Sequence, residues 1–248
     1  MGASSLLSLF LPLVLVRVLN PEQVGFYKLF FLYSATAPWI LLSAGLSNGL
    51  YFWAGQGDKR QDSFSATWTL QLCWSLGVVV VGALLWPFVQ IYHLFSLESP
   101  VLFVLLVLSI AATIPAQFLE EARISTGNTK WAAWYGTFWE FVKAIALMAA
   151  ALVFRSVTAL AFSYVIVISL KLLFSSLLTL KYKYAHLSLF KNGTTRAVLK
   201  YALPSSLAAA LAVIIGYCDQ FILGQKLSPA DFAVYSLGCL SVPPRLIF

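Results

Sequence analysis

Long stretches without a charged residue dominate this sequence, and Leu76–Trp86 and Val101–Ile110 are two of them. Of the 248 residues, 60% are hydrophobic and 10% are charged, whereas soluble domains carry about 25% charged residues. Such an apolar excess must face lipid, where backbone N–H and C=O groups have to be paired within the segment itself. The runs are continuous rather than alternating, which excludes membrane strands. The sequence therefore predicts an all-α, polytopic transmembrane helical bundle.

Turn chemistry and polar stretches divide the chain into spans of about 20 residues each. Asn20-Pro21, Ser99-Pro100 and Gly127-Asn128 favour turns or helix starts, while Gly55–Arg60 and Lys191–Thr195 are too polar for hydrocarbon. The eighth span is expected to be incomplete. We expect the spans at about 4–19, 29–53, 65–92, 100–121, 131–154, 157–180 and 202–224, and from 232 onward.

Basic residues predict the orientation of these spans. The loops after the second, fourth and sixth spans hold nine of the sixteen Lys and Arg residues, the opposite loops hold four, and the other three lie within spans. Because basic residues collect in cytoplasmic loops, we expect those three loops and the N-terminus to be cytoplasmic. The net charge of +7 has the same origin, so we expect no nucleic-acid partner.

A weak internal repeat joins the two ends of the chain. Leu19–Tyr27 and the residues up to Leu32 match Leu227–Tyr235 and its continuation at an offset of 208, with five identities in fourteen positions. Six spans separate the two copies, and an even number preserves orientation, so the pattern favours a parallel repeat of two halves. Residues 1–200 are then a first six-helix lobe and residues 201–248 the start of a second. The alternative is two similar hairpin turns that arose by chance.

Several stretches are similar to one known family. They are the first loop Arg17–Tyr27, the Gly-rich stretch Ala44–Leu50, the Leu203-Pro204 pair, the run Asp219–Gly224, and Leu227–Pro229 followed by Tyr235. Together they resemble bacterial polysaccharide flippases of the multidrug/oligosaccharidyl-lipid/polysaccharide exporter superfamily. The resemblance implies two lobes with about twelve to fourteen helices in all. The chain is therefore expected to be a fragment, with one full lobe and the start of the other.

Ionisable side chains inside spans are costly and mark candidate sites. Glu140 and Lys143 lie three residues apart on one helix face, where they form either an internal ion pair or part of a cavity wall. Lys171 has no acid nearby in the sequence, and its position deep in span six favours a cavity over an extension to the interface. Arg245 lies within the incomplete eighth span.

Other candidates lie at span ends. Arg123 follows Glu120 and Glu121 at the cytoplasmic end of span four. This cluster is either a solvated helix end or a cavity mouth where Arg123 contacts an anionic headgroup. Arg17 and Asp219 lie near the outer ends of spans one and seven, either as interfacial anchors or as a gate between the lobes.

The resemblance implies a function, and the cations suit it. A polyprenyl-pyrophosphate sugar is anionic, and Arg and Lys give charge-assisted hydrogen bonds to phosphate. We therefore expect a flippase that moves a lipid-linked oligosaccharide across the bacterial plasma membrane, without a cofactor or metal. Its expected partners are membrane lipids, a coupling H⁺ or Na⁺ and polysaccharide-assembly enzymes. The expected substrate-binding residues are Arg123, Glu140, Lys143, Lys171 and Arg245.

Three alternatives stay open. A cation-coupled multidrug antiporter of the same superfamily would favour acids and aromatics in its cavity. A membrane-embedded transferase acting on lipid-linked sugars would need a loop-borne acid or His constellation. No H-E-x-x-H, G-x-S-x-G or Walker-type motif is present, so we expect no enzyme activity. A non-transporting fragment is the third alternative.

Overall fold

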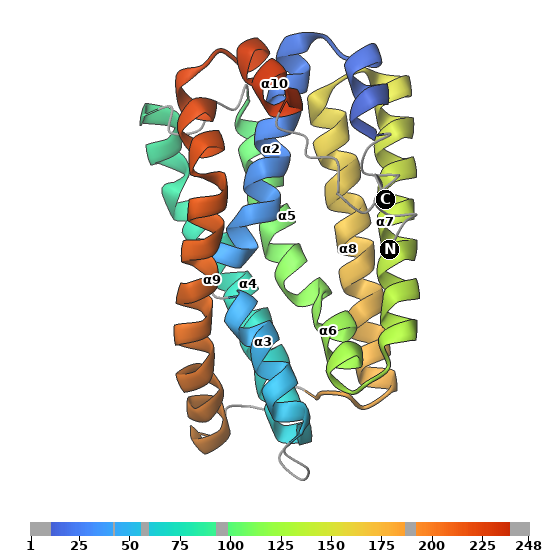
Figure 1. The fold of residues 1–248 in the computed structure, drawn as a ribbon, viewed down its shortest axis with the longest axis vertical. Helices are drawn as coiled ribbons and strands as arrows, with labels where there is room; N and C mark the ends of the chain where they lie inside the picture. Colours follow the sequence, from blue (N-terminus) through green and yellow to red (C-terminus); the bar gives the residue numbers. More distant parts are fainter. Residues whose placement is uncertain (1–10, 42, 56–59, 93–98, 187–191, 239–248) are drawn as a thin grey trace.

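The computed structural model describes residues 11–41, 43–55, 60–92, 99–186 and 192–238, and these residues contain helices and turns but no strand. Residues 11–18 are helical and lead into α2 (Figure 1). The helices that follow are α2 (Pro21–Ile40), α3 (Ser43–Ala54), α4 (Arg60–Tyr92), α5 (Pro100–Ala116), α6 (Phe118–Ser125), α7 (Thr129–Phe154), α8 (Val157–Lys181), α9 (Asn192–Lys226) and α10 (Pro229–Gly238).

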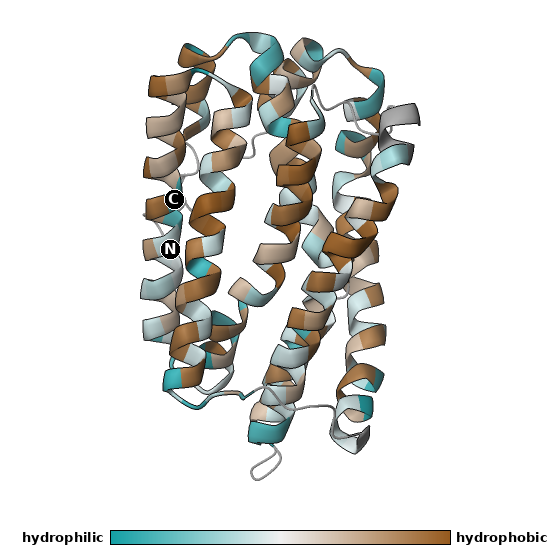
Figure 2. Cartoon of the chain, turned by 180° about the vertical axis from the view of Figure 1, so that it is seen from behind, coloured by the Kyte–Doolittle hydropathy of each residue, from teal (hydrophilic) through white to brown (hydrophobic). Residues whose placement is uncertain are grey.

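The bundle confirms an all-α polytopic membrane protein. Among the described residues, five helical segments are long and apolar enough to cross a membrane, and the pair α2–α3 would be a sixth span, broken by a bend of 49°. Large apolar side chains such as Leu76, Leu84 and Ile215 are exposed, and hydrophobic residues occupy much of the length of the helices (Figure 2). An apolar exterior of this kind is the surface that lipid requires.

Two helices begin before the spans expected from the sequence. Helix α2 begins at Pro21, whereas the second span was expected from about residue 29, because Asn20 caps the helix: its side chain accepts a hydrogen bond from the Gln23 N–H at 2.8 Å. Asn20-Pro21 is thus a helix start. Helix α9 begins at Asn192, whereas the seventh span was expected from about residue 202, so the polar residues up to Thr195 are helical. Residues 4–10 of the first span and those beyond 238 lie outside the described residues.

Helix α5 has a proline, Pro115, in its last turn. Pro115 has no N–H to donate to the carbonyl of Ala111 one turn earlier, and the Ser75 hydroxyl of α4 donates to that carbonyl at 2.6 Å instead. At Gln117 the chain turns from α5 into α6. The short helix α6 therefore has its own direction and contacts α3, α7 and α8.

Several apolar clusters among the described residues hold the bundle together, and two of them flank the site. The larger joins the first helical residues with α2, α5, α7, α8 and α10, and includes Phe30, Leu105 and Leu147. The smaller joins α3, α4 and α6 through Leu50 and Phe118, among others. Gln117, which lines the site described below, lies in the sequence between Ile114 of the first cluster and Phe118 of the second.

The two copies of the internal repeat have the same local structure and pack against each other. Ser228 caps α10 as Asn20 caps α2, since its hydroxyl accepts a hydrogen bond from the Asp231 N–H at 3.2 Å. Gly25 of α2 lies so close to the Pro229 carbonyl that a Cβ would not fit. Helix α9 continues this contact along α2 and α3 (Figure 1).

Candidate functional site

A polar cavity of about 200 Å³ lies between α2, α5, α7 and α8. Other hollows are lined almost wholly by apolar residues, for example those between α7 and α8 and between α4 and α5. In contrast, this cavity brings charged, polar and aromatic side chains together inside an otherwise apolar bundle. Its wall is formed by Ser34, Ala35, Trp39, Thr113, Gln117, Trp139, Glu140, Lys143, Tyr164, Val167, Ile168 and Lys171.

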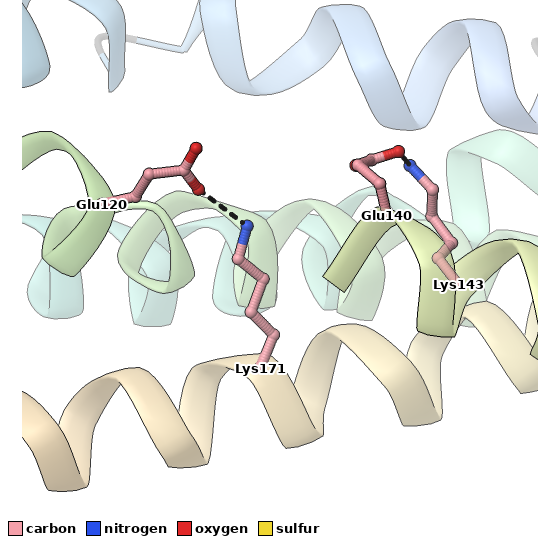
Figure 3. A network of polar contacts seen from close by, with 4 residues as sticks. All are labelled: Glu120, Glu140, Lys143 and Lys171. Atoms are coloured by element: carbon pink, nitrogen blue, oxygen red, sulfur yellow. Dashed lines mark hydrogen bonds and ion pairs between the residues drawn. The ribbon is translucent and has the colours of Figure 1, made fainter. Parts of the chain in front are cut away.

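Glu140 and Lys143 form an ion pair in the wall of this cavity (Figure 3). Their spacing on α7 places both side chains on one face of the helix, and Lys143 Nζ lies 2.6 Å from Glu140 Oε2. The side chain of Lys143 is 29% exposed and that of Glu140 is 52% exposed. The structure therefore combines the two alternatives, because the pair is internal and also lines the cavity.

Lys171 reaches the same cavity from α8 and pairs with an acid from another helix (Figure 3). Its Nζ lies 3.3 Å from Oε2 of Glu120 on α6, and its side chain is only 13% exposed. The ammonium also lies 5.9 Å from the centre of the Tyr135 ring of α7, within the range of a cation–π contact. The structure thus places Lys171 in the cavity wall rather than at the interface.

Arg123 lies apart from this cavity wall. Its guanidinium carbon is 4.6 Å, 4.7 Å and 4.8 Å from the ring centres of Trp131, Tyr182 and Tyr184, respectively. Its Nε is buried and has no hydrogen-bond acceptor among the described residues. Arg123 therefore joins the start of α7 to the end of α8 through aromatic contacts.

The gate candidates do not meet in this structure. Arg17 and Asp219 are both exposed, and neither belongs to one of the two ion pairs found among the described residues. Asp219 instead accepts a hydrogen bond from the Tyr235 hydroxyl. Arg245 lies outside the part of the chain that the structure describes.

Sequence reasoning missed the inward role of Glu120 and the aromatic wall of the cavity. Glu120 was expected either at a solvated helix end or at a cavity mouth, but it points inward to Lys171, 51 residues further along the chain. The one signal that could have indicated this is Pro115, because a proline break lets the next turn take a new direction. Nothing local predicted that Trp39 and Trp139 would share the cavity.

These features define a multi-pass helical membrane protein with a polar cavity between its helices. The sequence model of a family described as polysaccharide biosynthesis protein matches residues 14–242. The chain therefore belongs to that family, as its sequence motifs predicted.

A solved structure, the crystal structure of MATE in complex with MaD3S, has the same fold. Its TM-score to this chain is 0.62 at 14% sequence identity, and the similar region covers 84% of this chain and 50% of the other. This chain thus spans about half the length of that protein. A comparison with curated proteins finds no match.

Proposed function

We propose that this chain belongs to a flippase that moves a polyprenyl-pyrophosphate-linked oligosaccharide from the cytoplasmic to the outer leaflet of a bacterial plasma membrane. The observation that carries the proposal is the convergence of Lys143 and Lys171 on one cavity inside an apolar bundle. A pyrophosphate has to cross roughly 30 Å of hydrocarbon, and two ammonium groups compensate its charge through charge-assisted hydrogen bonds. Membership of the polysaccharide biosynthesis family supports this choice of substrate.

The size of the cavity suggests which part of the substrate it takes. Ligand pockets for whole small molecules usually have about 300–1,000 Å³, and this one has about 200 Å³. It suits the phosphate groups rather than an oligosaccharide. We infer that Trp39 and Trp139 border the sugar or the first prenyl units, while the remaining prenyl chain stays in lipid.

The proposal also includes the orientation of the protein in the membrane, its partners and the driving force for transport. The N-terminus is cytoplasmic, as the distribution of basic residues predicts. The partners are membrane lipids, the lipid-linked oligosaccharide and the enzymes that assemble the polysaccharide. We infer that transport is driven either by the substrate gradient or by a coupling H⁺ or Na⁺.

A second candidate function is the antiport of organic cations. It is favoured by the half-exposed carboxylate of Glu140 and by the two tryptophans of the cavity wall, since aromatic faces and carboxylates bind cations. Under this function the acid would be the essential group, whereas flipping of a pyrophosphate depends on the lysines.

Flipping in reconstituted vesicles tests the proposal. A fluorescent lipid-linked oligosaccharide would be incorporated, and its transfer between leaflets measured by quenching from outside. Lys143→Ala and Lys171→Ala should each slow the transfer about ten-fold or more, because each removes a hydrogen bond to a charged group. Lys181→Ala, an exposed substitution in the last turn of α8, is the matched control and should have no effect. Unchanged flipping in both cavity variants, with loss of organic-cation transport in Glu140→Gln, would favour the antiporter.

A further inference from the structure

Glu120 is a charged group that is not part of the cavity wall but pairs with Lys171, which is. It comes from α6, its side chain is 28% exposed, and its Oε2 lies 3.3 Å from Lys171 Nζ. Figure 3 shows its side chain beside Lys171, separate from the pair Glu140–Lys143. An anionic substrate that binds Lys171 has to compete with this carboxylate.

Gly136 of α7 provides the space in which the Glu120 carboxyl lies. A Cβ at Gly136 would lie 2.5 Å from Glu120 Oε1, 3.1 Å from its Cδ and 3.4 Å from its Oε2. The nearest neighbours of this glycine are thus the three atoms of that carboxyl group. A larger residue at this position would push the carboxyl away, which is easy because it ends a flexible side chain.

A partly buried ammonium is less stable without a counter-charge close by. The side chain of Lys171 is 13% exposed and that of Glu120 is 28% exposed, so loss of the carboxylate would leave a partly desolvated charge without its partner. Without a bound anion from the substrate, Lys171 therefore needs another counter-charge, and Glu120 supplies it. The Tyr135 ring at 5.9 Å gives the ammonium a second, weaker contact that does not depend on Glu120.

We propose that Glu120 is an internal counter-anion that occupies Lys171 while the cavity is empty and is displaced by the phosphate of the substrate. This inference rests on the proposed function and adds a residue that determines specificity. Because the carboxylate has to be replaced, a multiply charged phosphate group can occupy the site, whereas a weakly basic monoanion competes poorly. Glu140 differs, because its ion-pair partner Lys143 lies three residues away on the same helix. The two side chains therefore stay close together even when the pair is broken.

Binding of farnesyl pyrophosphate to the purified protein in detergent tests this role, with neutral farnesol as the reference probe. Glu120→Gln should bind farnesyl pyrophosphate about two- to five-fold more tightly, the range of a partly exposed ion pair. Gly136→Ala should act in the same direction without any change of charge, because its methyl group displaces the carboxyl. Farnesol binding should not change. Glu22→Gln removes an exposed acid in the first turn of α2 and controls for net charge.

A third variant separates competition from a structural role. In a Lys171→Ala background, Glu120→Gln should no longer affect binding, since the two residues act through one contact. If Glu120 only supported the fold, Glu120→Gln and Gly136→Ala would weaken binding or leave it unchanged, and this would overturn the proposal while the cavity still bound the probe. If the wild-type protein bound farnesyl pyrophosphate no better than farnesol, the proposed function itself would fail, and the role of Glu120 with it.

Discussion

Arg123, which lies outside the cavity wall, is surrounded by aromatic side chains. Three aromatic rings lie within 4.8 Å of its guanidinium carbon. Each such contact contributes about 0.5–2 kcal/mol, and contacts that share one guanidinium group do not add fully. Arg123→Ala should therefore lower the free energy of unfolding by about 1–3 kcal/mol, and thermal unfolding in detergent measures the loss. Lys130→Ala, an exposed change close by in sequence, is the control. Equal stability of the two variants would show that the rings do not hold the arginine.

Residues that are close in sequence could be paired from the sequence, and those far apart could not. The spacing of Glu140 and Lys143 predicted a shared helix face, which the 2.6 Å contact agrees with. The partner of Lys171 could not be predicted from the sequence. Helix α5 ends before Gln117 and α6 begins after it, and this interruption lets Glu120 of α6 contact Lys171. The rings around Arg123 likewise come partly from residues that follow α8.

At the scale of helices, close contacts between α3 and α9 depend on small residues. A Cβ at Gly45 would collide with the Ala202 carbonyl oxygen and with Ser206, whose hydroxyl accepts a hydrogen bond from the Gly45 N–H at 3.0 Å. Gly45→Ala should force the helices apart and reduce stability by about 1–3 kcal/mol. Gly216→Ala is the matched control, because nothing lies within 4 Å of that position. The alanine should be neutral or slightly stabilising there. Thermal unfolding distinguishes the two, and an undiminished stability of Gly45→Ala would contradict the close contact.

The existence of the helices was easier to predict than their ends. Uninterrupted apolar runs required helices wherever lipid surrounds the chain, and Ser99-Pro100 and Gly127-Asn128 marked real boundaries. Outside the apolar runs, the polarity of a residue did not predict where a helix ends. The first turn of α2 contains polar residues that are helical because Asn20 caps them, and polar residues also form the first turn of α9. The bend between α2 and α3 was not predicted from the sequence.

At the scale of the whole molecule, the loops that are rich in Lys and Arg follow helix ends on the same side of the bundle. The end of α3, the turn between α6 and α7 and the end of α8 lie at one end of the bundle (Figure 1), as the predicted alternation of spans requires. In a cysteine-free background, a membrane-impermeant maleimide added outside cells should label Lys226→Cys but not Lys130→Cys, both of which are exposed positions. The opposite pattern of labelling would invert the orientation.

The most direct test of the central claim is an experimental structure of this protein with a polyprenyl-pyrophosphate-linked oligosaccharide bound. We expect phosphate oxygens within hydrogen-bonding distance of the Nζ atoms of Lys143 and Lys171, with the carboxyl of Glu120 displaced from Lys171. A structure in which both ion pairs persist while the lipid binds elsewhere, for example in the apolar hollow between α2, α4 and α5, would contradict it.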